Sequence, residues 1–254
     1  MTPWEMAAVA GAGLVAGAVN TIVGSGSLIS FPTLLAVGLP PVAANVTNTV
    51  GLVPGVVSGA VGYRRELRGQ LARTVRLSVA GGAGGTVGAI LLLSLPSSTF
   101  EKVIPFLVLV AVVLTIAQPR LQREMAGRRR SGGREEGPAL LVSVFAIGIY
   151  GGYFGAAQGV ILLALMGIFL NDHLQRLNAV KNVVAVVING VAAVLFVIVA
   201  DVRWPVALVE AAGAVVGGQL GATVGRRLSP AVLRAAIVII GLAVSIKLFA
   251  DAFA

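Results

Sequence analysis

The feature that most constrains this chain is the absence of charge from Met6 to Tyr63. Further charge-free intervals rich in aliphatic residues follow, at 77–100, 103–119, 137–171, 182–200 and 211–225. A helix needs about 20 apolar residues to cross a bilayer, and these intervals reach or approach that length. Charged residues make up 11% of the chain, against about 25% in soluble domains. The pattern predicts an all-α polytopic membrane protein, not a soluble enzyme or nucleic-acid-binding domain, despite a net charge of +9.

Glycine, proline and polar residues divide the apolar sequence into ten expected helical elements, five in each half. Two elements, 27–38 and 158–170, are short: at 1.5 Å per residue they span about 20 Å of a hydrocarbon core about 30 Å thick. We expect broken or re-entrant half-helices there. The expected elements are 4–23, 27–38, 42–62, 75–95, 102–118, 139–154, 158–170, 178–200, 204–225 and 231–250.

The arginines predict the orientation. Loops 64–76 and 119–137 hold most of them and are separated by two elements, so both can face the cytoplasm under the positive-inside rule. The same parity places 171–181 and 226–234 inside. We therefore expect a multi-pass protein of the cell inner (plasma) membrane with both termini outside. Three basic residues fall on the outer side: Lys102, Arg203 and Lys247.

An internal repeat relates the two halves at a shift of about 133 residues. Gly84–Ala89 matches Gly217–Ala222, and Asn48 matches Asn182. An odd number of elements per half gives the two halves opposite orientations, which is the inverted-repeat architecture of many secondary transporters. The expected divisions are a first transmembrane repeat at 1–118, a cytoplasmic Arg-rich linker at 119–138 and a second repeat at 139–254.

Small residues surround the expected breaks at 20–27 and 150–159. A break frees backbone N–H groups that lipid cannot satisfy, so the segment must face protein or a wet cavity. The following half-helix would direct its positive dipole end at that cavity, which suits an anion. The alternative is that the glycines only permit close helix packing. The candidate residues are Ser25, Gly26 and Ser27 in the first half and Ala157 and Gln158 in the second.

A second polar cluster, Asn45–Thr49, is matched by Asn178–Asn182 in the other half. Amides and hydroxyls can donate to an anion, and Lys181 would add a cation on one side. Helix capping at an interfacial loop, with the lysine as an inside anchor, is the alternative. The candidates are Thr47, Asn48, Lys181 and Asn182.

Glu210 is the only acidic residue well inside an expected span, which suggests a coupling or gating role. Its position near the outer end of its element leaves open that it reaches the headgroups. His173 is expected in a solvated loop beside Asp172. No cluster of metal ligands or catalytic triad is visible, so we expect no enzyme activity, no metal and no cofactor.

Three segments resemble the TauE/SafE sulfite-exporter family of membrane proteins: Gly24–Pro32, Ala43–Thr49 and Gly62–Arg65. Lys181–Asn182 in the second half fits the same pattern, and the resemblance covers essentially the whole chain. It implies transport of small sulfur-containing anions such as sulfite or organosulfonates. It carries a binding role over to Ser25, Gly26, Ser27, Asn48, Ala157, Gln158, Lys181 and Asn182.

The sequence therefore predicts a secondary transporter that moves a small anion by alternating access. The chain shows no nucleotide-binding domain, so an ion gradient or the substrate's own gradient would supply the energy, with protons as the first choice. Three alternatives remain: an anion channel of the same fold, a non-transporting membrane scaffold whose Arg-rich loops dock a partner, and, less favoured, transport of a metal or an amino acid. The expected partners are the bilayer and a small anion, and no nucleic acid. Neither the direction of flux nor the oligomeric state follows from these features.

Overall fold

The computed structural model describes residues 1–128, 137–223 and 230–253. Within these ranges the chain forms ten α-helices and no strand, which confirms the all-helical prediction. Nine helices begin and end close to the expected positions, but α5 continues to Arg128, beyond the expected end at 118. The helices are α1 (Pro3–Ile22), α2 (Ser27–Ala36), α3 (Pro41–Gly62), α4 (Leu71–Ser94), α5 (Ser97–Arg128), α6 (Pro138–Tyr153), α7 (Gln158–Phe169), α8 (Leu174–Val199), α9 (Trp204–Thr223) and α10 (Pro230–Phe253).

Among the described residues, five helices are long and apolar enough to cross a membrane: α1, α4, α5, α8 and α9. Shorter apolar helices include α2, α6 and α7. The helix α2 has 10 residues and α7 has 12, which corresponds to about 15 and 18 Å. The protein is therefore a multi-pass membrane protein with two half-length helices, as the sequence predicts.

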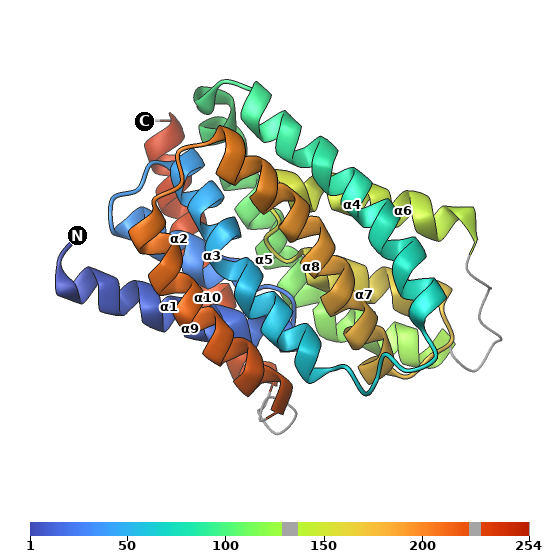
Figure 1. Cartoon of the computed structure of the whole chain (residues 1–254). Helices are drawn as coiled ribbons and strands as arrows, with labels where there is room; N and C mark the ends of the chain where they lie inside the picture. The colour runs from blue at the N-terminus through green and yellow to red at the C-terminus, as the bar shows by residue number, and fades with distance from the viewer. Residues whose placement is uncertain (129–136, 224–229, 254) are drawn as a thin grey trace.

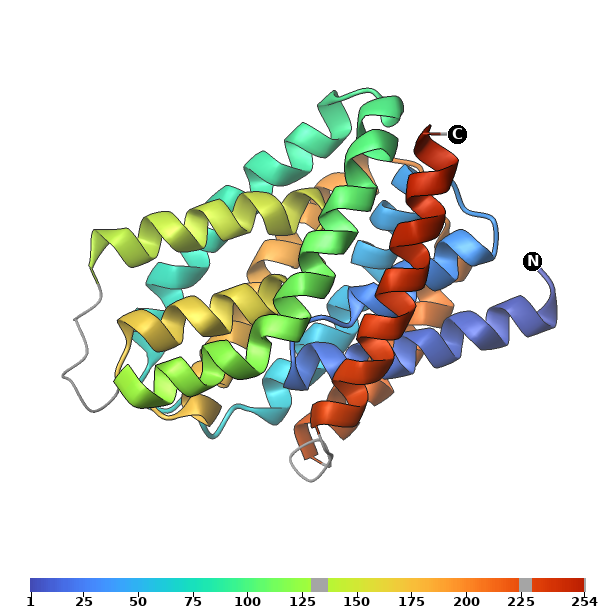
Figure 2. The same ribbon diagram turned by 180° about the vertical axis from the view of Figure 1, so that it is seen from behind.

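The main helix contacts occur in corresponding pairs. The helix α1 packs on α9 as α6 packs on α4, and α3 packs on α9 as α8 packs on α4. Likewise α2 contacts α10, while α7 contacts α5. The pairs α3–α8 and α5–α10 join the halves, and α5 and α10 are seen together in Figure 2. Exchanging each helix with the one five places along reproduces this pattern, as two related halves would. The inverted orientation of the halves stays a prediction.

Rows of small residues bring the paired helices into backbone contact. A Cβ atom on Gly17 of α1 would lie 2.3 Å from the Ala214 carbonyl oxygen of α9. A Cβ atom on Gly84 of α4 would lie 2.0 Å from the Phe145 carbonyl oxygen of α6. Since lipid provides no hydrophobic drive between helices, such close approach supplies the van der Waals contact that holds them together.

One end of the bundle carries a charged cluster that joins two loops. The Asp172 carboxylate, in the α7–α8 loop, accepts from Arg73 and Arg176, each at 2.9 Å. Arg176 also donates to the Arg68 carbonyl oxygen in the α3–α4 loop at 3.2 Å. The two loops thus share one face, as the charge parity requires. The start of α1 and the end of α10 lie on the same side of the molecule (Figure 1). The arginines expected at 129–134 and 226–227 lie outside the described residues.

Candidate functional site: the crossing of two broken helices

Two short non-helical breaks interrupt the helices. One lies at 23–26, between α1 and α2, and the other at 154–157, between α6 and α7. Gly24 has a φ of +92° and Gly155 a φ of +77°, a left-handed conformation that side chains disfavour. Ala157 adopts the same region with a φ of 59° and is the only described non-glycine residue to do so. Both expected breaks are present, and glycines allow the turn in each.

The two breaks touch each other through their backbones. The Gly159 N–H donates to the Gly24 carbonyl oxygen at 3.2 Å. A Cβ atom on Gly24 would lie 2.5 Å from the Gly159 Cα, and one on Gly159 would lie 2.6 Å from the Gly24 Cα. We call this contact the crossing. It brings together segments far apart in the sequence, and only glycine fits on either side of it.

The carbonyl end of α1 is covered by polar side chains of α8. The Lys181 ammonium donates to the carbonyl oxygens of Asn20, at 3.0 Å, and Thr21, at 3.4 Å. The Asn178 and Asn182 amides also donate to the Thr21 carbonyl oxygen, at 3.2 and 3.5 Å. The C-terminal end of a helix carries partial negative charge, so it stabilises the buried ammonium without an acidic partner.

The other half repeats part of this arrangement. The Asn45 amide of α3 donates to the Tyr153 carbonyl oxygen at the end of α6, at 3.0 Å. Asn178, its match at the repeat shift, does the same at the end of α1. Both broken helices are therefore capped by an asparagine from the opposite half of the chain. The lysine is present on one side only, because the first half has uncharged residues, Thr47 and Asn48, at the matching positions.

A small cavity of about 20 Å³ lies at the crossing. Its polar lining comes from Asn20, Ser27, Gln158, Lys181 and Asn189. Among the residues that the structure describes, Lys181 is the only charged one that lines it, and none of the lining residues is acidic. The volume holds about one water molecule, so this conformation is closed around the crossing.

Gln158 begins α7 at the edge of this cavity. Its amide nitrogen donates to the Asn189 side-chain oxygen at 2.7 Å, while its own amide oxygen has no hydrogen-bond partner. The absence of a side chain at Gly151 leaves room for it, since a Cβ there would lie 1.9 Å from that oxygen. A buried polar atom without a partner costs about 1–3 kcal/mol. The site therefore keeps an unused acceptor in this conformation, and the amide N–H group that could donate to an anion is bonded to Asn189.

The first N–H groups of α7 are bonded within the protein. Gln158 N–H donates to the Gly155 carbonyl oxygen, Gly159 N–H to that of Gly24, and Val160 N–H to that of Ala157. On the α2 side, Gly26 N–H donates to the Asn20 side chain at 2.7 Å. An anion at these helix ends must therefore replace protein acceptors, which requires the crossing to loosen.

The remaining predicted residues surround the crossing without lining its cavity. Asn48 accepts a hydrogen bond from Ser30, and Thr47 accepts one from the Arg203 N–H at 3.2 Å. Ser25 is fully buried, and its hydroxyl has no hydrogen-bond partner. Their geometry suits a supporting role: they hold α2, α3 and the break in place around the residues that face the cavity.

Two polar residues of the cavity lining, Asn20 and Asn189, are absent from the predicted set. Asn189 is the only strongly polar residue between Asn182 and Asp201, and a lone amide in an apolar span usually bonds across helices. That signal would have identified it. Asn20 lies in the last turn of α1, just before the first break. Its side-chain oxygen accepts a hydrogen bond from the Gly26 N–H, and its carbonyl oxygen accepts one from Lys181.

Glu210 is fully buried and does not reach the surface, so the headgroup alternative is wrong for this conformation. Both carboxyl oxygens have no hydrogen-bond partner. A Cβ on Gly51 of α3 would lie 2.5 Å from one of them. His173, by contrast, is exposed in its loop as expected.

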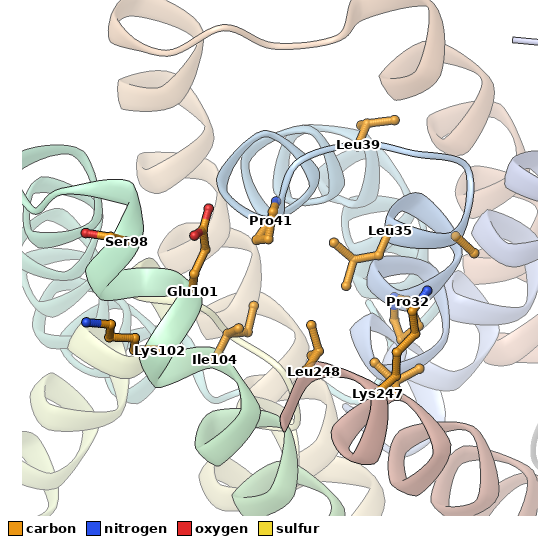
Figure 3. Close-up of a pocket in the computed structure, with 12 residues that line it drawn as sticks. Pro32, Leu35, Leu39, Pro41, Ser98, Glu101, Lys102, Ile104, Lys247 and Leu248 are labelled. Atoms are coloured by element: carbon orange, nitrogen blue, oxygen red, sulfur yellow. The ribbon is translucent and has the colours of Figure 1, made fainter. Parts of the chain in front are cut away.

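A larger cavity, of about 430 Å³, lies near the ends of α2, α5 and α10. Figure 3 shows Leu35, Ile104 and Leu248 in its lining, with Glu101 and Lys247 also beside it. It is separate from the crossing in its lining, but α2 contributes to both, with Ser27 at one end and Leu35 near the other.

Comparison with known proteins identifies the family. The family described as Sulfite exporter TauE/SafE matches residues 9–248. The chain belongs to this family. A probable membrane transporter protein of Haemophilus influenzae is 29% identical over 94% of this chain and 92% of its own length. YfcA of Escherichia coli K12, also described as a probable membrane transporter protein, is 27% identical over 94% and 87%. No solved structure matches the chain. Family and relatives together indicate a membrane transporter, and the family implies an anionic substrate.

Proposed function

We propose that the protein is a secondary transporter of the inner membrane that moves a small sulfur-containing anion, such as sulfite or an organosulfonate, by alternating access. One observation carries the proposal: Lys181 is the only charged residue at the crossing, and its ammonium is held by helix carbonyls instead of an acid. A buried cation paired in this way can still take an anion, since no carboxylate competes for it. The family supplies the substrate class.

The binding role falls first to the residues that face the cavity. Lys181 supplies the positive charge, Ser27 a hydroxyl, and Gln158 an amide at the start of α7. Charge-assisted hydrogen bonds to an anion are about twice as strong as neutral ones, so the lysine should contribute most. Gly26, Ala157, Thr47, Asn48 and Asn182 position these groups.

Transport requires the closed crossing to open. Loosening the contact between Gly159 and Gly24 would free the Gly159 N–H. The positive N-terminal end of α7 would then face the enlarged cavity and could bind an anion. Rocking of one five-helix half against the other would expose that cavity first on one side and then on the other. A space of about 20 Å³ in the closed form argues for a carrier that opens in steps and against a continuously open channel.

The proposal is tested by flux into proteoliposomes with radiolabelled sulfite and a labelled organosulfonate. We expect saturable uptake in the wild type. Lys181→Met should weaken apparent affinity about 10- to 100-fold, because it removes about 1.5–3 kcal/mol of charge-assisted bonding. Ser27→Leu and Asn182→Leu should abolish uptake while the protein remains in the membrane. Lys102→Met changes an exposed lysine that does not line the crossing cavity, so it is the matched control and should behave as the wild type.

Three results would contradict it. Normal uptake in Lys181→Met, Ser27→Leu and Asn182→Leu would remove the binding site from the crossing. Single-channel currents without saturation would indicate an anion channel. A scaffold protein would show no flux, and no small anion would raise its unfolding temperature, whereas a ligand stabilises the fold by mass action.

A further inference from the structure

Glu210 is a buried acidic residue of α9, and the helices packed around it carry no basic side chain that could pair with it. The helix α9 packs on α1 and α3, and the carboxyl group lies against Gly51 of α3. On the α1 side, a Cβ on Gly13 would lie 2.4 Å from the Glu210 backbone oxygen. The side chain is fully buried, and neither carboxyl oxygen accepts a hydrogen bond from the described residues, because the neighbouring Ser30 hydroxyl donates to Asn48 instead. The acid is thus enclosed where two glycines let three helices meet.

No charged group of the neighbouring helices can compensate it. The helices α2 and α3 lie wholly within the charge-free stretch Met6–Tyr63, and α1 carries only Glu5, in its first turn. The helix α9 has no other charged residue. A carboxylate without a partner is very costly in such surroundings. The packing therefore fits the neutral, protonated acid.

Packing alone does not require an acid at this position. At the repeat shift, Glu210 corresponds to Leu77 of α4, which is buried in the core beside Val184 and Ile188. The same place in the other half is thus filled by an ordinary apolar side chain. The acid appears in one half only, which points to a function carried out once per molecule.

The acid is also connected to the crossing through α2. The Ser30 hydroxyl lies beside the Glu210 carboxyl and donates to the Asn48 side chain. Ser27, one turn earlier on α2, lines the cavity at the crossing. Residues three apart lie on the same face of a helix, so one short rigid helix contacts both the anion cavity and the acid.

We propose that Glu210 is the proton-binding site that couples anion transport to a proton gradient. When α9 separates from α1 and α3, water enters, the carboxyl O–H bond breaks and the proton passes to water. The carboxylate then needs hydration, which keeps the helices apart. Reprotonation restores the neutral acid and lets the dry packing close again, so one proton binds and leaves per cycle. This inference rests on the transport function proposed above.

The test separates gradient-driven transport from exchange in proteoliposomes. Glu210→Gln keeps the size of the side chain but cannot release a proton. We expect it to exchange labelled for unlabelled anion at least half as fast as the wild type, yet to lose accumulation driven by a pH gradient of either direction. Its exchange rate should also no longer vary with pH. Glu210→Leu, which copies Leu77, should fold and show the same loss. Glu101→Gln, an exposed acid, should keep gradient-driven accumulation.

The inference is overturned if Glu210→Gln or Glu210→Leu accumulates anion in a pH gradient as the wild type does. A readout independent of transport is the infrared carbonyl band of a protonated carboxylic acid in the purified protein at neutral pH. The band should be present in the wild type and absent in Glu210→Gln, and a wild type without it contradicts the inference. Wild-type protein that shows the band but exchanges no anion would reject the transport function and leave the proton site standing.

Discussion

At the scale of the residue, Ala157 holds the second break in a conformation that its own side chain disfavours. Its φ of 59° and ψ of 13° are left-handed, and the residue is almost fully buried. An L-residue pays about 1–2 kcal/mol for this region. The counterpart of Ala157 in the first half, Gly26, has a φ of −62° and carries no such cost. The second half therefore stores backbone strain beside the start of α7.

Ala157→Gly should relieve this strain. The gain exceeds the added conformational freedom of glycine in the unfolded chain, about 0.5–1 kcal/mol, so we expect a net stabilisation of about 0.5 kcal/mol. Thermal unfolding in detergent should show a rise of about 1–2 °C. Ala156→Gly is the matched control: Ala156 is fully buried and lacks a positive φ, so glycine there should lower the transition. A lower transition for Ala157→Gly would contradict the assignment of strain.

Some features of these single residues were predictable from the sequence, and others depend on tertiary packing. Gly24 and Gly155 were predictable, because breaks within lipid need residues that turn freely and pack closely. The lack of a charged partner for Glu210 was also predictable, since the helices that it contacts carry almost no charge. Which helices it touches was not, because the face of α9 that is buried depends on tertiary packing. The same holds for Lys181, whose partners are carbonyl groups of a helix 160 residues away.

At the scale of the element, Asp172 joins the α7–α8 loop to the first turns of α4 and α8. Its burial alone would raise the pKa of the carboxyl group, but the His173 N–H, Arg73 and Arg176 favour the charged form, and the net pKa is lowered. A carboxyl group whose folded pKa is lowered stabilises the fold above its unfolded pKa, and the contribution is lost as pH falls through the lowered value.

Asp172→Asn should therefore destabilise the protein at neutral pH. We expect a loss of about 1 kcal/mol and a transition about 2–4 °C lower, because the ion pairs are partly exposed. The difference from wild type should persist from pH 8 to pH 4 and close only below the ordinary value of 3.8. Asp201→Asn, in the exposed pair with Arg203, should change little. Equal transitions for wild type and Asp172→Asn at pH 7 would show that the loops are held by other contacts.

Element lengths were predictable for most of the chain. The charge-free intervals identify the long helices, and glycine-rich breaks separate the half-helices α2 and α7 from their neighbours. The end of α5 was not, because charged residues after Pro119 suggested a loop, whereas the helix continues past this proline. A proline removes one backbone bond and bends a helix, but does not always end it.

At the scale of the whole molecule, the proposed transport requires two halves that meet at the crossing to move against each other. Their main helix contacts occur in corresponding pairs, and the breaks meet in backbone contact at Gly24 and Gly159. Val56 of α3 and Ala185 of α8 also line the cavity there, one from each half. Neither is assigned a binding role, so they can report movement without removing a ligand.

The absence of cysteine makes a direct measurement possible. Val56→Cys and Ala185→Cys, introduced together, are joined by a short reducible thiol linker, and uptake of a labelled organosulfonate is then followed in proteoliposomes. We expect linkage to stop saturable uptake and reduction to restore it. Each single-cysteine protein should transport before and after treatment with the linker. Unchanged uptake through the linked protein would show that the anion crosses the membrane without opening this site, and would contradict alternating access through the crossing.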